Sequence, residues 1–219
     1  MGLAASISDD VNLGVTSGAW TVLLHHKNLG GASNQSGVRT SVYTGAALAG
    51  TPLWNGADAW PVAQEGLVNS GDIESSKLKF SASYVAGGVW VGRSETGVLQ
   101  IDLPFSGLRL LLNITHPVIT ANISNQGAVR DGVIAGVLGA EDFIEEFRTV
   151  LGTFDSSLCS GSTFDSFAQQ LRAASDILAD GTNASGPPCD GISIGLGFTA
   201  KPVIRGAVAA PNPHVDTCP

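Results

Sequence analysis

One short segment near the C-terminus has the spacing of a serine nucleophile. Gly191, Ser193 and Gly195 form the G-x-S-x-G pattern, in which the serine stands on a sharp turn between a strand and a helix. Here apolar residues alternate with small or polar ones through the pattern and on to Ala200, which predicts a continuous strand with Ser193 on its solvent face. The one downstream histidine, His214, lies in a proline-rich tail. We therefore expect no catalytic residue, and a secreted hydrolase with Ser193 as nucleophile stays open as the alternative.

The histidines and acidic residues could instead hold a metal ion. His25 and His26 are adjacent, so in a strand they point to opposite faces. No H-x-H, H-E-x-x-H or C-x-x-C spacing of a zinc site occurs. Three carboxylates and one amide form a loose group of oxygen ligands without the D-x-D-x-D-G order of an EF-hand: Asp176, Asp180, Asn183 and Asp190. We expect no metal and no cofactor, and a site near His25 and His116 belongs to the hydrolase alternative.

The cysteines indicate a disulfide. Cys159 and Cys189 lie in loop-like segments on either side of an expected helix. Two such cysteines predict a disulfide formed in an oxidising compartment, with unpaired thiols in a reducing cytosol as the alternative. Cys218, next to the C-terminal residue, is then a free thiol or the partner of a cysteine removed with a trimmed leader.

Two tryptophans are the candidate ligand-binding residues. Trp54 and Trp60 are spaced through residues 45–71, a stretch rich in Gly, Ala, Asn and Pro. Aromatic side chains in so irregular a segment usually plug it onto a neighbouring sheet, and lone apolar side chains need no functional explanation. If the pair is exposed, it forms a platform for a carbohydrate or a hydrophobic ligand.

Composition restricts the class of protein and its partners. Of 219 residues, 43% are hydrophobic and 14% charged, which is typical of a folded domain with its own core. Eleven basic residues oppose nineteen acidic ones, a formal net charge of −8, so we expect no binding to nucleic acid or to anionic membranes. No apolar run reaches the roughly 18–20 residues of a membrane span.

The first residues bear on location. Met1 to Ser6 lack the basic start and long apolar stretch of a secretory signal. They satisfy the N-myristoylation pattern, but a Met-Gly start is also what remains when a leader is trimmed. We expect the trimmed leader, and hence an extracytoplasmic protein that is secreted, periplasmic or surface-anchored through that leader.

Alternating apolar and polar residues dominate residues 77–138. Phe80, Ala82 and Tyr84 share one parity, opposite Lys79 and Ser81, so each run is expected to bury one face. Short breaks with Gly and Asn predict antiparallel neighbours, a β-meander. The other expected strands are 19–26, 38–44, 99–103, 108–114, 119–123, 132–138 and 192–200.

Between the last two strands the period becomes helical. One apolar stripe runs from Phe143 to Phe154, and a second helix is expected from about Phe164 to Ala179. Phe147 and Leu171 lie mid-helix on these stripes and are expected to be buried. The predicted fold class is α+β: a mainly antiparallel meander with a two-helix hairpin (about 140–180) packed on one face and a returning C-terminal strand.

We expect one domain over 1–219. Its predicted parts are an irregular β-rich segment (1–72), the sheet with the helical hairpin (73–205) and an extended tail (206–219).

Four segments carry a family resemblance: 84–90, 132–138, 154–159 and 189–198. Over about residues 75–200 the chain resembles uncharacterised secreted or lipoprotein sequences of myxobacteria. The resemblance implies an envelope location and brings no known activity. The N-terminal lipobox cysteine usual in such proteins does not occur in this sequence.

Together these features predict a non-catalytic, extracytoplasmic binding or structural module of the cell envelope rather than an enzyme. Its partner would be an unknown envelope component or a small ligand. That partner would meet the exposed sheet face or the segment of Trp54 and Trp60.

Overall fold

The computed structural model describes residues 3–105, 108–124, 126–183, 186, 188–212 and 216–218. The chain has an α+β fold, largely β, as predicted. Its elements are α1 (Leu3–Ser17), β1 (Thr21–Lys27), β2 (Gln35–Gly45), β3 (Ala59–Val62), η1 (Gln64–Gly66), β4 (Leu78–Ala86), β5 (Val89–Arg93), β6 (Val98–Phe105), β7 (Leu108–Ile123), β8 (Val129–Gly139), α2 (Ala140–Phe154), η2 (Ser156–Cys159), α3 (Ser162–Ala173), β9 (Gly191–Ala200) and β10 (Ile204–Val208).

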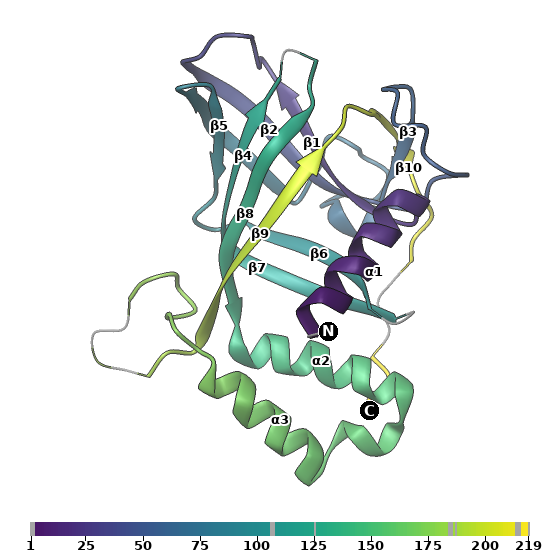
Figure 1. Cartoon of the computed structure of the whole chain (residues 1–219), viewed down its shortest axis with the longest axis vertical. Helices are drawn as coiled ribbons and strands as arrows, with labels where there is room; N and C mark the ends of the chain where they lie inside the picture. The colour runs from purple at the N-terminus through teal and green to yellow at the C-terminus, as the bar shows by residue number, and fades with distance from the viewer. Residues whose placement is uncertain are drawn as a thin grey trace.

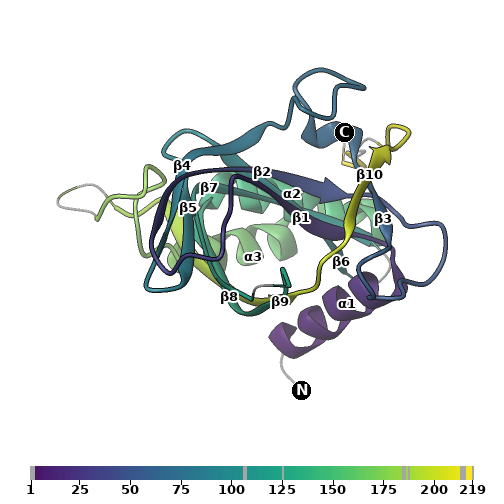
Figure 2. The same ribbon diagram turned by 90° about the horizontal axis from the view of Figure 1, so that it is seen from above.

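The strands of the described residues form one ten-stranded sheet in the order β10-β3-β2-β4-β5-β7-β8-β9, with β1 added on β2 and β6 on β7 (Figure 1). Every strand pair is antiparallel except β3 with β10. Seen from above, the strands curve around a common interior and α1 lies at its open side (Figure 2). The sheet therefore has an inner face, toward this interior, and an outer face, which is open to solvent except where side chains such as Leu23 and Tyr43 are buried on it.

A β-bulge on β4 changes which side chains face the core. Thr40 of β2 pairs with Phe80, and Val38 pairs with Ser83, so β4 has one residue more than β2 between these two pairs. Ser83 consequently takes the inward position, and its hydroxyl donates to the carbonyl of Val38 at 2.7 Å. Tyr84 points outward and is 41% exposed, so the prediction that Phe80 and Tyr84 share a face is wrong.

A second bulge lies in β7, at His116 and Pro117, between the pairs Thr115–Val137 and Val118–Ala135. The two apolar runs expected as separate strands, 108–114 and 119–123, are one bent strand. On either side of the bulge, β6 and β5 pair with the same edge of β7, and β8 pairs with its other edge.

Two clusters fill the core. The larger one joins the inner face of the sheet to α2, and among its buried members are Phe80, Trp90, Ile101, Leu112, Ile114, Ile119 and Val150. The smaller one lies where β3 meets β1 and β2, and its buried members are Leu23, Tyr43, Trp60, Val62 and Leu67.

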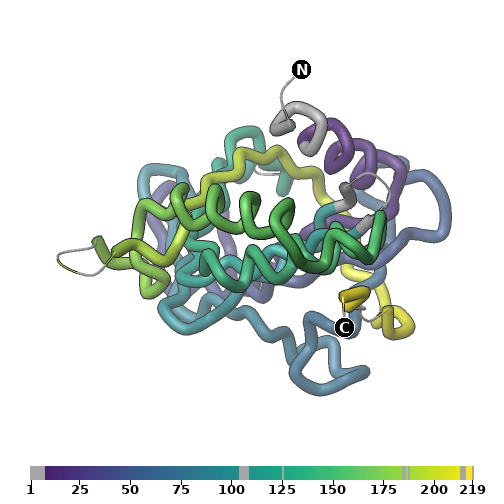
Figure 3. The backbone as a smooth tube through the Cα atoms, turned by 90° about the horizontal axis from the view of Figure 1, so that it is seen from below, coloured from purple at the N-terminus to yellow at the C-terminus, as the bar shows by residue number. Residues whose placement is uncertain are grey.

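The helices differ from the sequence prediction in number and place. The N-terminal part opens with α1, where no helix was expected, and α1 contacts β6. Helix α3 ends at Ala173, short of the predicted Ala179. Figure 3 shows α2 and α3 side by side across the end of the sheet, where α2 contacts β7 and β8. Phe147 of α2 is half-buried and stacks on Phe167 of α3, with ring centroids 4.2 Å apart.

The disulfide joins Cys159 to Cys218, and Cys189 is a free, half-exposed thiol. The predicted pair Cys159–Cys189 is therefore wrong. The C-terminal segment returns to α2, where the hydroxyl of Thr217 donates to the carbonyl of Thr149 at 2.7 Å. The tail expected to be extended thus contributes β10 and a segment bonded to α2.

Candidate functional site

The two candidate tryptophans do not form an exposed pair. Trp60 is fully buried, and its indole N–H donates to the carbonyl of Ala46 at 2.7 Å. Trp54 is half-buried against it, with ring centroids 5.6 Å apart. The ammonium of Lys201 lies 5.9 Å from the centroid of the Trp54 ring. Trp60 thus holds β3 against the segment that follows β2. Ligand binding at Trp54 stays a prediction.

Ser193 lies within strand β9 and not on an elbow turn. Its backbone N–H and its hydroxyl both donate to the carboxylate of Asp176, at 2.8 and 2.5 Å. These bonds lower the pKa of Asp176, which makes that carboxylate a weak base. A nucleophilic serine needs a base that accepts its proton. The carboxylate of Asp176 instead accepts the backbone N–H of Ser193 on the strand that ends the sheet order, where backbone donors have no further strand to pair with.

The described histidines do not converge on one site. His25 is on the outer face of β1, and its Nδ1 is 3.4 Å from Arg205; burial, followed by the charge of Arg205, lowers the pKa of His25. His26 is on the inner face, where its Nδ1 is 2.8 Å from the hydroxyl of Thr40. Burial lowers the pKa of His26 to about 4. His116 lies at the bulge of β7, and within the described ranges no three His, Cys, Asp or Glu side chains gather as a metal site.

The structure brings together another set of residues, on the outer face of the sheet. One row of cross-strand neighbours runs from β4 to β9, and a second runs beside it from β7 to β9. We call these two rows the outer patch. Its members are Tyr84, Val91, Thr120, Val133 and Gly197 in the first row, and Val118, Ala135 and Gly195 in the second.

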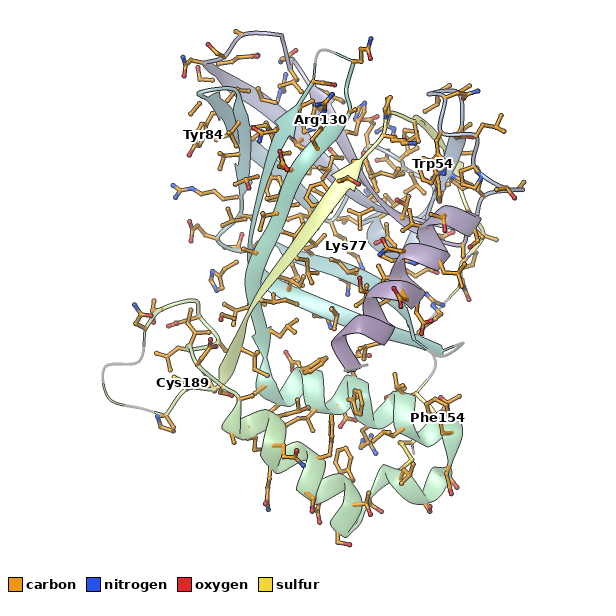
Figure 4. All side chains as sticks on the ribbon, in the orientation of Figure 1. Trp54, Lys77, Tyr84, Arg130, Phe154 and Cys189 are labelled. Carbon is orange, nitrogen blue, oxygen red and sulfur yellow. A yellow bond between two sulfur atoms is a disulfide. The ribbon has the colours of Figure 1, made fainter. Side chains whose placement is uncertain are left out.

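Several apolar side chains of the outer patch are exposed. Tyr84 is 41%, Val118 36% and Val133 45% exposed. At the other end, a β-carbon placed on Gly195 or Gly197 would meet no heavy atom within 4 Å, so the glycines form an open, flat floor. In Figure 4, Tyr84 projects from the side of the molecule opposite Trp54. Exposed apolar surface that continues across neighbouring residues is typical of interaction sites.

Charged groups border the outer patch without interrupting its rows. Arg93 follows on β5, opposite Val118, and Asp131 precedes Val133 on β8 by two residues. The segment that precedes β9 pairs only with the start of that strand, through an isolated β-bridge between Ile177 and Gly191. Because β9 ends the strand order, the patch extends to an open edge of the sheet.

Sequence reasoning expected an exposed sheet face but did not identify these residues. Tyr84 was missed because the bulge on β4 reverses its direction. In the sequence, Gly195 stands out only as part of the G-x-S-x-G pattern. A usable signal was present in β9, where small residues alternate with Ile194, Leu196 and Phe198. Such alternation indicates one face without large side chains.

Comparison with known proteins adds no relative. No family model matches the chain, and no curated protein or solved structure matches it. The resemblance to secreted sequences of myxobacteria stays a prediction. Among the described residues, no helix has both the length and the apolar character needed to cross a membrane.

Proposed function

We propose that the protein is a non-catalytic binding module that acts outside the cytoplasm, in the cell envelope, and that its outer patch contacts the partner. The single observation that carries the proposal is the exposure of Tyr84, Val118 and Val133 on one continuous, uncharged stretch of sheet. Soluble proteins rarely leave such a surface uncovered without a partner.

The chemistry of the outer patch favours a flat contact. Tyr84 offers an aromatic ring with a polar tip, and the glycines of β9 let another backbone or a ring approach closely. Burial of a whole valine side chain contributes about 1.5–3 kcal/mol. Burial of the exposed parts of these side chains on binding therefore contributes a few kcal/mol. Part of this free energy offsets the translational and rotational freedom lost on association.

Two further observations support the location. The bond between Cys159 and Cys218 is of a kind that persists in oxidising compartments. The resemblance to secreted sequences points to the envelope as well. The contacts of Ser193 with Asp176 give no support to the hydrolase alternative.

Co-sedimentation with bacterial envelope fractions tests the proposal. We expect the parent protein to sediment with at least one fraction, and Val133→Asp to weaken that binding by about tenfold or more, because it places a charge in an apolar contact. Val68→Asp is the matched control, since Val68 is 68% exposed but lies outside the sheet. Failure of the parent to bind any fraction, or equal binding by Val133→Asp, would contradict the proposal.

A further inference from the structure

A pocket lies on the other half of the outer sheet face, over β1, β2 and β4. Its volume is about 210 Å³, and its lining includes three cations, one carboxylate and two hydroxyls: Lys27, Arg39, Lys79, Glu74, Ser41 and Ser81. Ligand pockets for drug-sized molecules measure about 300–1,000 Å³. This pocket therefore suits one compact group.

Strand register brings the cations together. Lys27 is the cross-strand partner of Arg39, and Ser41 is the partner of Lys79. All four side chains consequently lie on the outer face of three adjacent strands. Like charges placed directly opposite each other destabilise a sheet, so the pairing of Lys27 with Arg39 costs stability unless an anion lies between them.

Glu74 offsets only part of this charge. Its carboxylate lies 2.7 Å from the ammonium of Lys27 and 2.5 Å from the guanidinium of Arg205. Hydrogen bonds from Lys27 and Arg205 lower the pKa of Glu74 to about 2, so the group is ionised at neutral pH. Within the described chain, Arg39 and Lys79 form no ion pair. The three lining cations, together with Arg205, which pairs with Glu74 from outside the lining, make four positive charges against one carboxylate.

This local excess of positive charge runs against the charge of the whole chain, which is −8. Residues 140–190 contain nine acidic residues and two arginines. Helices α2 and α3, which carry five of these acidic residues, form the lower end of the molecule in Figure 1, so part of the negative charge lies away from the pocket. Such separation steers an anion to the pocket from a distance.

We propose that the pocket binds a phosphate group, carried as a phosphomonoester by the partner of the outer sheet face. The inference rests on the proposed function, because it names the chemistry of the partner in that function. A phosphomonoester carries between one and two negative charges at pH 7 and three acceptor oxygens. Arg39 supplies a planar donor fork, Lys27 and Lys79 supply ammonium groups, and the hydroxyls of Ser41 and Ser81 complete the donors.

Glu74 competes with the phosphate for Lys27. When phosphate binds, Glu74 either loses its ion pair with Lys27 or stays beside a second anion. Both outcomes cost free energy and weaken phosphate binding. Removal of its charge is therefore expected to strengthen phosphate binding. If Glu74 had a purely structural role, removal of its charge would not strengthen phosphate binding.

Calorimetric titration at low ionic strength tests the inference, with inorganic phosphate and glucose 6-phosphate as probes. Arg39→Gln and Lys79→Gln should each weaken binding by about tenfold or more, because each removes a charged donor. Glu74→Gln should strengthen it by about threefold or more. Arg130→Gln, which removes one exposed positive charge from β8, should change it by less than about twofold. Raising the salt concentration should weaken binding by the parent.

A vesicle arm separates the two sources of a phosphate. Binding to phosphatidic acid vesicles but not to phosphatidylcholine vesicles, lost in Arg39→Gln, assigns the phosphate to a lipid headgroup. Binding to glucose 6-phosphate alone assigns it to a soluble or polymeric sugar phosphate. The inference is overturned if the parent binds none of the phosphate probes, or if Arg130→Gln weakens binding as much as Arg39→Gln.

The outcome also separates this inference from the proposed function. Envelope binding that depends on Val133 but persists without any phosphate binding refutes the inference alone. Phosphate binding by a protein that sediments with no envelope fraction refutes the proposed function instead.

Discussion

Acidification from pH 7 to pH 4.5 should destabilise the protein through one buried histidine, His26. Its Nδ1 lies 2.8 Å from the hydroxyl of Thr40, and its ring meets Trp90 edge-on with centroids 4.7 Å apart. Burial, followed by the neighbouring His25, lowers the pKa of His26 from 6.5 to about 4. Between about pH 4 and pH 6.5, the imidazole is therefore mostly neutral in the folded protein but mostly charged in the unfolded chain.

The sign and size of the effect follow from proton binding. Between pH 6.5 and pH 4 the unfolded chain binds more protons at this group than the folded protein does, so the free energy of unfolding falls as the pH falls. A pKa lowered from 6.5 to about 4 corresponds to about 3 kcal/mol in full, of which about 2 kcal/mol is lost between pH 7 and pH 4.5. Below pH 4 this histidine contributes no further loss.

Urea unfolding of the parent and of His26→Gln at both pH values measures the difference. Glutamine keeps a polar group near Thr40 but does not titrate, and the carboxylates titrate in both proteins, so their effects cancel in the comparison. The parent should lose about 2 kcal/mol more than the variant on acidification. Equal losses in the two proteins would refute the reasoning and would mean that His26 is not held as a neutral, buried ring.

Three other perturbations have defined outcomes. Cys218→Ser should lower the free energy of unfolding by about 4 kcal/mol in the chain-entropy model, because the bond spans 59 residues; Cys189→Ser should leave chemical unfolding unchanged, and equal losses in both would contradict the pairing. Gly152→Ala would normally stabilise a helix by about 1 kcal/mol, but it should lower the Tm because the new β-carbon would lie 2.3 Å from the sulfur of Cys218; a higher Tm would be the contrary result. Phe147→Ala should cost about 3 kcal/mol in urea unfolding, since it removes a ring stacked on Phe167, and an unchanged midpoint would show that the stack does not hold α3 in place.

Most strands could be predicted from the sequence, because each one buries a single face. Alternation located β4, β6, β8 and β9, and the apolar parity of Leu110, Leu112 and Ile114 matches their burial. Alternation could not show the extra residue in β4 that reverses the chain before Tyr84. A bulge depends on the partner strand, which a local pattern does not contain.

Neither helix α1 nor the correct disulfide pairing could be predicted from local sequence patterns. Helix α1 has a weak apolar stripe, with Leu13 65% exposed while Val11 packs on the core, so its period is indistinct. The sequence favours Cys189 as the partner of Cys159 because the two cysteines lie in loop-like segments on either side of an expected helix. The return of the C-terminal segment to α2, which brings Cys218 to Cys159, depends on tertiary packing.

The outer patch illustrates the same limit for function. Its two rows join residues from five strands between β4 and β9, and their proximity depends on strand register. The sequence favoured an exposed sheet face in general, but it also offered Trp54 and Trp60. Burial of Trp60 leaves the sheet face as the better candidate.

Radical footprinting with and without an envelope fraction that retains the protein tests the central claim most directly. It reports the solvent access of individual side chains on opposite sides of the molecule. Our account predicts that binding reduces the modification of Tyr84 and Val133, while Leu53 and Phe154, which are 73% and 56% exposed, are modified as before. Protection of Leu53 and Trp54 with no change at Tyr84 and Val133 would contradict it.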